Sequence, residues 1–172
     1  IIHTYIQIVT AQNAIPKPKG IPPHDFEGPV RDGFAVDWPI RYDDIAPWYT
    51  HVESFAGISG NKDGLEVLPD GDFLPAWEMN DAEKELQQKI MAAYPDRYVI
   101  QGRCAHLTSP KQIHLDQGRG KCMARNLCER GCPFGAYFSS NSSTIPAAQK
   151  TGNLHIQTDA VVDSLLYDEK EN

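Results

Sequence analysis

The sequence has no long hydrophobic run, no excess of positive charge and no paired C-x2-C knuckles. None of its apolar stretches approaches the roughly 18 residues that a membrane-spanning helix needs, so we expect no membrane span. The net charge of −7 over 172 residues argues against nucleic acid as a partner, because phosphate binding needs basic surface. Without paired knuckles, a structural zinc site is disfavoured.

The sequence also lacks an initiating Met and a basic leader followed by a small-residue cleavage site. Its last residues, Asp168–Asn172, read as a turn entered from a strand, with no returning strand behind it. From these features we expect a piece of a longer protein. The hydrophobic share of 41% and the charged share of 23% are ordinary for a globular chain.

Local signals predict two helices in the first half of the chain, after a Pro/Gly-rich loop over residues 11–30. The first helix is expected to be capped by Asp43 or Asp44 and closed by Gly57. Apolar residues at helical spacing predict a buried stripe on it, which consists of Ile45, Trp48, Tyr49, Val52 and Phe55. The second helix is predicted to start at Asn80 in a capping box with Glu83, with Leu86 on its buried stripe.

The second half shows weaker signals. Tyr98–Ile100 predicts a short strand, and residues 140–150 predict a short helix. Residues 154–157 and 161–167 alternate in polarity and predict two further strands. The expected class is therefore α+β with long loops.

All four cysteines lie between positions 104 and 132. Cys122, Cys128 and Cys132 have the spacing C-x5-C-x3-C, and Cys104 lies eighteen residues upstream. Three interpretations compete: partly buried thiols or disulfides, a zinc site, and an iron–sulfur cluster held by thiolates of one loop. Glycine and proline turns favour the cluster, as do nearby cations that would offset its charge, namely Lys121, Arg125 and Arg130, with Arg119 as a further candidate.

The run Cys122–Ala136, CMARNLCERGCPFGA, resembles the central segment of the glucose–methanol–choline oxidoreductases, in particular their bacterial sugar-dehydrogenase branch. The same pattern continues through Ser139–Ala148, Thr151–Leu154, Ala160–Val162, Asp37–Ile40 and Pro47–Tyr49. The resemblance implies an α+β, loop-rich central fragment of that fold. Residues 1–24 would be an unassigned arm, 25–152 a substrate-side segment with the cysteine loop, and 153–172 strands of the FAD-binding domain.

The resemblance implies an FAD-dependent oxidoreductase that oxidises a CH–OH group of a sugar or polyol. Val162 would lie beside the FAD adenine. Cys122, Cys128 and Cys132 would hold a [3Fe-4S] cluster that takes electrons from the flavin, while Cys104 has no role in the pattern. Further implied partners are a small subunit and a cytochrome electron acceptor, and the implied compartment is the periplasm.

The G-x-G-x-x-G fingerprint of the family is absent, and its catalytic His would lie beyond residue 172. The chain alone is therefore expected to be inactive. The alternative function is a small iron–sulfur or metal-binding electron-transfer module.

Several other polar and aromatic residues have simpler explanations. His106 and His114 could face a substrate or a cluster, but solvated loop histidines are the favoured interpretation. Trp38, Trp48 and Trp77 are candidates for stacking on a sugar ring, although packing explains Trp48 better. The acidic residues Asp63, Glu66, Asp70 and Asp72 lack the fixed spacing of a calcium loop and are interpreted as a solvated loop.

Overall fold

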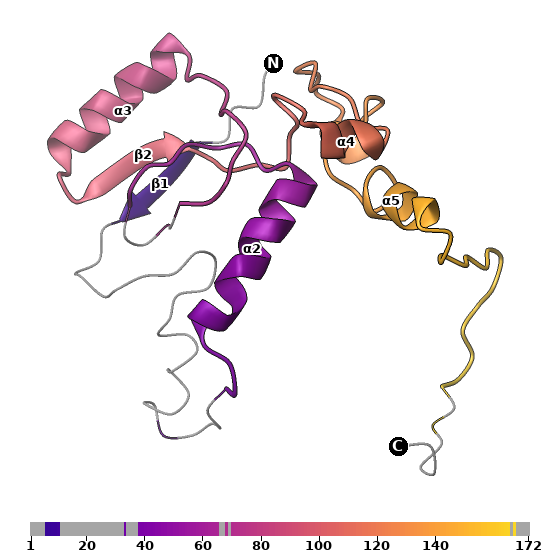
Figure 1. The fold of residues 1–172 in the computed structure, drawn as a ribbon. Coiled ribbons are helices and arrows are strands. Elements are labelled where there is room, and N and C mark those ends of the chain that lie inside the picture. The colour runs from indigo at the N-terminus through magenta and orange to yellow at the C-terminus, as the bar shows by residue number, and fades with distance from the viewer. Residues whose placement is uncertain are drawn as a thin grey trace.

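The computed structural model describes residues 6–10, 33, 38–65, 68, 70–165 and 167. The elements in chain order are β1 (Ile6–Thr10), α2 (Tyr42–Ala56), α3 (Asp81–Ala93), β2 (Arg97–Gln101), α4 (Gln112–Asp116), the 3-10 turn η1 (Cys128–Arg130) and α5 (Thr144–Lys150). Long loops connect them (Figure 1). The predicted loop at 11–30 lies outside the described residues, as does most of the predicted arm at 1–24. No helix in the described part is long and apolar enough to cross a bilayer.

β1 and β2 form a two-stranded antiparallel sheet in which Ile6 pairs with Gln101 and Thr10 with Arg97. Helix α3 lies against β2 (Figure 1), and Gln87 on α3 donates to the carbonyl oxygen of Val99 at 2.6 Å. The strand predicted at Tyr98–Ile100 is confirmed and is one residue longer at each end.

The predicted helix ends are mostly confirmed, because local side-chain hydrogen bonds set them. Asn80 accepts from the Glu83 backbone N–H at 3.0 Å, and the Glu83 carboxylate accepts from the Asn80 N–H at 2.7 Å, which is the expected capping box. Gly57 ends α2 with a φ of 77°, a left-handed conformation that glycine adopts without strain. The start of α2 was predicted wrongly: Arg41 is the N-cap, and Asp43 and Asp44 lie inside the first turn.

The predicted buried stripes are wrong on both helices. Trp48 is 67% exposed, Val52 is also exposed, and only Tyr42 and Ala56 of α2 are buried. No residue of α3 is buried, and Leu86 is exposed. Helical spacing identifies which side chains share a face, whereas burial depends on another element covering that face.

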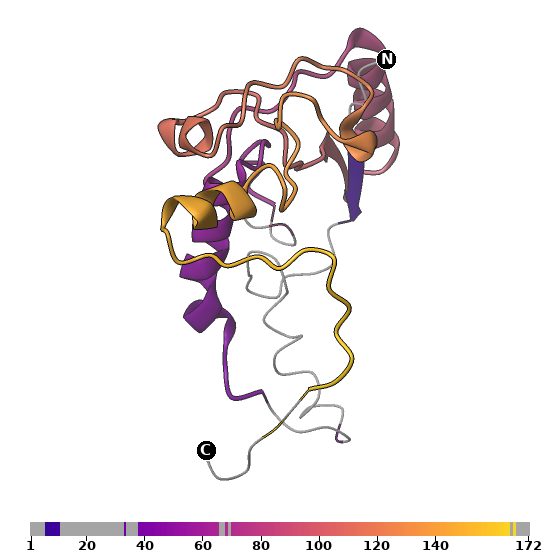
Figure 2. The ribbon, with the colours of Figure 1, turned by 90° about the vertical axis from the view of Figure 1, so that its right-hand side faces the viewer.

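The segment after α5 leaves the body of the molecule as an extended chain (Figures 1 and 2). In the described part of 154–167 there is no strand, so the two predicted strands are wrong for this structure. Val161 is 96% exposed. A strand needs a neighbour to take its backbone hydrogen bonds, and the two strands that the structure describes, β1 and β2, pair with each other and not with this segment. Its assignment to an FAD-binding domain stays a prediction.

A small core lies beneath the cysteine loop. Leu74, Leu107, Cys122 and Ala136 form one buried cluster, against which Trp77 and Cys132 pack. Backbone hydrogen bonds tie the loops around it, for example from Ser59 N–H to the Cys104 carbonyl at 2.7 Å. The body that carries the cysteines is therefore made of loops held by paired backbone groups, and the helices α2, α4 and α5 lie along one side of it (Figure 2).

Candidate functional site

One hollow brings together the three cysteines predicted as ligands. Cys122, Cys128 and Cys132 all line it, with His106, Phe134 and Tyr137 among its other walls. We call it the cysteine hollow. It is narrow, with room for about one water molecule between its walls. All four cysteines of the chain are free thiols, so the disulfide interpretation is wrong for this structure.

Each of the three cysteines is positioned differently. Cys122 is buried in the core cluster, and its N–H donates to the Leu107 carbonyl at 2.8 Å. Cys128 opens the turn η1, and its thiol donates to the Arg125 carbonyl at 3.6 Å. Cys132 begins a tight turn that Gly135 closes, with the Gly135 N–H donating to the Cys132 carbonyl at 3.0 Å.

The turn that starts at Cys132 favours its thiolate. Burial alone would raise the pKa of the Cys132 thiol, but the backbone amides of residues 134–137 near the sulfur oppose this effect. Their combined influence holds the pKa of Cys132 below the ordinary value of a cysteine. Thiolates, not thiols, bind metals, so Cys132 is the best-prepared ligand of the three.

A buried guanidinium lies behind this turn. Arg119 is 2% exposed; it donates to the carbonyl oxygens of Gly135 at 2.9 Å, Ala136 at 3.3 Å and Ala56 at 2.8 Å. Among the residues that the structure describes, no carboxylate pairs with it. Burial lowers the pKa of Arg119 and the nearby Cys132 sulfur raises it, but a guanidinium stays charged in proteins. Arg119 thus fastens the Cys132 turn to the end of α2.

The other cations proposed from the sequence lie further out. Lys121 and Arg130 are exposed. Arg125 lines the cysteine hollow and lies over the Phe134 ring at 5.6 Å. Of the four candidates, only Arg119 is buried, and neither periodicity nor spacing in the sequence indicated this.

Cys104 lies at the side of the hollow, with its sulfur 3.6 Å from Nε2 of His106. Burial raises the pKa of Cys104, and the nearby Cys128 and Cys122 sulfurs raise it further, whereas the Ala105 amide lowers it. Burial lowers the pKa of His106, whose ring lies 5.1 Å from that of Tyr137. Cys104 is therefore held as a neutral thiol next to a neutral imidazole.

The interpretation of His106 and His114 as solvated is wrong, because both side chains are buried. His114 accepts at Nδ1 from the Lys111 N–H at 2.9 Å, and its Nε2 donates to the Ser54 carbonyl, also at 2.9 Å. These partners fix a neutral tautomer, and burial accordingly lowers the pKa of His114. His114 joins α4 to the end of α2, which is a structural role.

The donor set bears on both metal interpretations, the zinc site and the iron–sulfur cluster. In the described part of the chain, no three or more His, Cys, Asp or Glu side chains are arranged to hold one metal ion, and this holds for either metal. In an iron–sulfur cluster each cysteine thiolate binds a different iron. The three thiols around the hollow therefore agree with such a cluster in the number and the chemical type of its ligands. The hollow would have to widen to admit it.

Val162 lies in the extended C-terminal segment, where it is 79% exposed. Val162 is not among the residues that line the cysteine hollow. Its predicted contact with the FAD adenine stays a prediction.

The chain matches no family model. It is similar to the fructose dehydrogenase large subunit of Gluconobacter japonicus, with 27% identity over 154 residues, which are 86% of this chain and 26% of that protein. The chain therefore spans about a quarter of the length of the curated relative it matches.

Proposed function

We propose that this chain is part of a flavin-dependent oxidoreductase that oxidises an alcohol group of a sugar or related polyol, and that the cysteine hollow holds its iron–sulfur cluster. The observation that carries the proposal is the meeting of Cys122, Cys128 and Cys132 at one hollow. Similarity to a fructose dehydrogenase large subunit supports the substrate class. FAD, which accepts a hydride from an alcohol carbon, would be bound mainly by the rest of the protein.

The chain's own residues support a thiolate-bound cluster in distinct ways. Cys122, Cys128 and Cys132 would hold it, and such a cluster supplies one-electron transfer. The amides around the Cys132 sulfur already stabilise negative charge, and Arg119 adds a buried positive charge behind that turn. Cys104 is held as a neutral thiol and lies outside the proposed ligand set. A cytochrome acceptor, a small subunit and a periplasmic location complete the proposal and rest on the family resemblance.

The test is anaerobic reconstitution of the 172-residue chain with ferrous iron and sulfide. We expect bound iron and sulfide, brown visible absorbance and the electron paramagnetic resonance signal of an oxidised three-iron cluster. Cys128→Ser should abolish all of these, whereas the matched control Cys104→Ser should keep them. A chain that binds no iron and sulfide, or that needs Cys104 as much as Cys128, contradicts the proposal. FAD retention is measured separately, and we expect none.

A further inference from the structure

Positive charge is concentrated in the stretch that carries the cysteine loop. Between Asp116 and Asp159 the sequence holds five Lys and Arg residues and one acidic residue, Glu129. Over the whole chain the acidic residues are in excess, 23 against 16. This stretch therefore has the opposite charge to the chain as a whole. Charge of one sign gathered on part of a surface attracts partners of the other sign.

Three of these cations are available to a partner. Lys121, Arg125 and Arg130 are exposed, whereas Arg119 is buried and holds the Cys132 turn. Among the side chains that the structure describes, no carboxylate forms an ion pair with any of the three. Their charges are therefore turned to solvent and are not spent on the fold.

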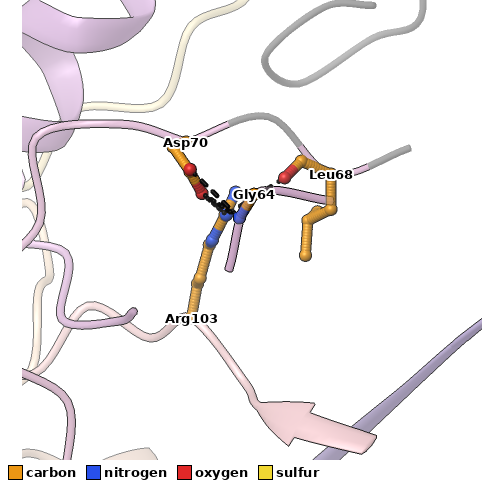
Figure 3. A network of polar contacts seen from close by, with 4 residues as sticks. All are labelled: Gly64, Leu68, Asp70 and Arg103. Atoms are coloured by element: carbon orange, nitrogen blue, oxygen red, sulfur yellow. Dashed lines mark hydrogen bonds and ion pairs between the residues drawn. The ribbon is translucent and has the colours of Figure 1, made fainter. Parts of the chain in front are cut away.

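Arg103 shows how the same chain holds a cation that does serve the fold. Its side chain is 15% exposed and donates to the Leu68 carbonyl at 3.2 Å and to Oδ1 of Asp70 at 3.3 Å, while Oδ2 of Asp70 accepts from the Gly64 N–H at 3.2 Å (Figure 3). Burial raises the pKa of Asp63, and the nearby charge of Arg103 opposes this. Asp63 and Asp70 are only partly exposed, so their interpretation as a solvated loop is wrong. No described carboxylate holds the three exposed cations in this way.

Exposed apolar side chains lie among these cations. Met123 is 58% exposed, Leu127 41% and Phe134 37%. All three line the cysteine hollow, as does Arg125, whose guanidinium lies 5.6 Å from the centre of the Phe134 ring. Apolar side chains within a charged rim are typical of protein interfaces, in which Met, Arg and aromatic residues are enriched. We call this surface the basic loop face; it consists of Lys121, Met123, Arg125, Leu127, Arg130 and Phe134.

We infer that the basic loop face binds a protein segment that carries Asp and Glu residues around an apolar side chain. The carboxylates of the segment pair with Lys121, Arg125 and Arg130, and each guanidinium can take a carboxylate through two parallel hydrogen bonds. The apolar side chain of the segment covers Met123 and Phe134. The inference does not rest on the proposed function, because neither an iron–sulfur cluster nor a flavin takes part.

An anionic bilayer suits this face less well than a protein segment does. Each basic residue near such a bilayer contributes about 1 kcal/mol, so three of them give a marginal attachment. A flat bilayer also meets the field of the whole chain, whose net charge is −7. A protein segment contacts the loop face alone, and charges more than about 8 Å away are largely screened at physiological salt.

The three methionines of the chain provide a test with internal controls. Met123 lies on the basic loop face, Met91 is exposed on α3, and Met79 lies outside the loop face. The 172-residue chain, labelled with ¹³C at the methionine methyl groups, is titrated with a short synthetic peptide of Glu, Leu and Phe. The matched probe is the same peptide with Lys in place of Glu. We expect the acidic peptide to shift the Met123 signal alone, with a Kd on the order of 0.1 mM, and the basic peptide to bind at least about tenfold more weakly. Raising the salt from about 0.02 M to about 0.5 M should weaken the acidic peptide several-fold, because exposed ion pairs are screened.

Lys121→Glu combined with Arg130→Glu should weaken binding of the acidic peptide about tenfold, because two attractions become repulsions. The matched control is Lys84→Glu combined with Lys89→Glu on the exposed surface of α3, which changes the net charge by the same amount. This control should bind within about twofold of the original chain.

The inference is overturned if the acidic peptide leaves Met123 unchanged, if the basic peptide binds as tightly, or if the two double variants lose binding equally. Salt-independent binding of the acidic peptide by the original chain would also overturn it, and this measurement needs no variant. A Met123 signal that responds to phosphatidylglycerol vesicles and not to the peptide would identify a membrane instead. A shift of Met123 with chain concentration alone would identify a second copy, and either result overturns the inference. Peptide binding by a chain that fails to take up iron and sulfide would contradict the proposed function and leave this inference standing.

Discussion

Replacing Arg119 by Met should destabilise the chain more than any other single change at a charged residue of the described structure. The carbonyl oxygens of Ala56 and Gly135 lose the Arg119 donor, whereas the Ala136 carbonyl still accepts from the Leu107 N–H at 3.1 Å. Each buried acceptor left unpaired costs about 1–3 kcal/mol. Relief of the desolvation cost of the guanidinium, together with entry of water, offsets part of this sum. We expect a net loss of about 3 kcal/mol in the free energy of unfolding.

The assay is urea unfolding of the 172-residue chain followed by far-UV circular dichroism, with the slope compared between variants. The matched control is Arg97→Met, because Arg97 is half-exposed and its ion pair with Asp96 is 3.7 Å long. Exposed pairs contribute at most about 1 kcal/mol. Arg119→Lys should fall between the two, since one ammonium cannot reach three carbonyls as a guanidinium fork does.

Equal losses for Arg119→Met and Arg97→Met would refute the reasoning, since they would mean that water replaces the guanidinium at no cost. A loss confined to the slope, with no change of midpoint, would point to an altered unfolded state instead.

Three further predictions concern buried groups and one glycine. Lowering the pH from about 7.5 to about 5.5 should destabilise the chain, because burial lowers the pKa of His106 and His114 in the folded state below 6.5. Below pH 6.5 the unfolded chain therefore takes up more protons than the folded chain. The free energy of unfolding falls between pH 6.5 and the folded pKa by up to about 1.4 kcal/mol per pH unit per histidine. Urea unfolding at each pH checks this, and a slope that His114→Gln does not reduce relative to His51→Gln contradicts it. At pH 7, iodoacetamide should alkylate Cys132 faster than Cys104 by about an order of magnitude, because their pKa values are shifted down and up respectively; peptide mass spectrometry that finds Cys104 modified first would exclude this. Gly57 and Gly152 both have a positive φ, but an added Cβ would meet the Leu107 and His114 side chains only at Gly57. In thermal unfolding, Gly152→Ala should lower the free energy of unfolding by about 1 kcal/mol, and Gly57→Ala by at least about 2 kcal/mol more. Similar losses for the two variants would count against the predicted clash.

Features that depend on a few neighbouring residues were predictable from the sequence. The capping box of Asn80 and Glu83 and the left-handed Gly57 each involve residues within one turn of a helix. The strand around Val99 was predicted for a similar reason, since its run of apolar residues, Tyr98–Ile100, is local. The spacing of the three cysteines likewise suggested a common site, and their side chains do line one hollow.

Features that depend on distant partners were not predictable. Trp48 is exposed because no described element covers its face of α2. Val162 is in no strand because neither β1 nor β2 pairs with its segment. The burial of His114 depends on the Ser54 carbonyl, 60 positions away. Nothing in the sequence distinguishes Arg119 from the other loop cations, because its carbonyl partners Ala56 and Gly135 lie in distant segments.

The bonds of Arg119 also bear on the order of folding. Its bond to Gly135 closes a span of 16 positions, and its bond to Ala56 closes a span of 63. Because the entropy of loop closure grows with the logarithm of length, the longer closure costs about 1 kcal/mol more. On this ground we expect the guanidinium to meet the Cys132 turn before α2 docks onto it. Arg119 in this way joins a turn of the cysteine hollow to a helix that contains no cysteine and lines no part of that hollow.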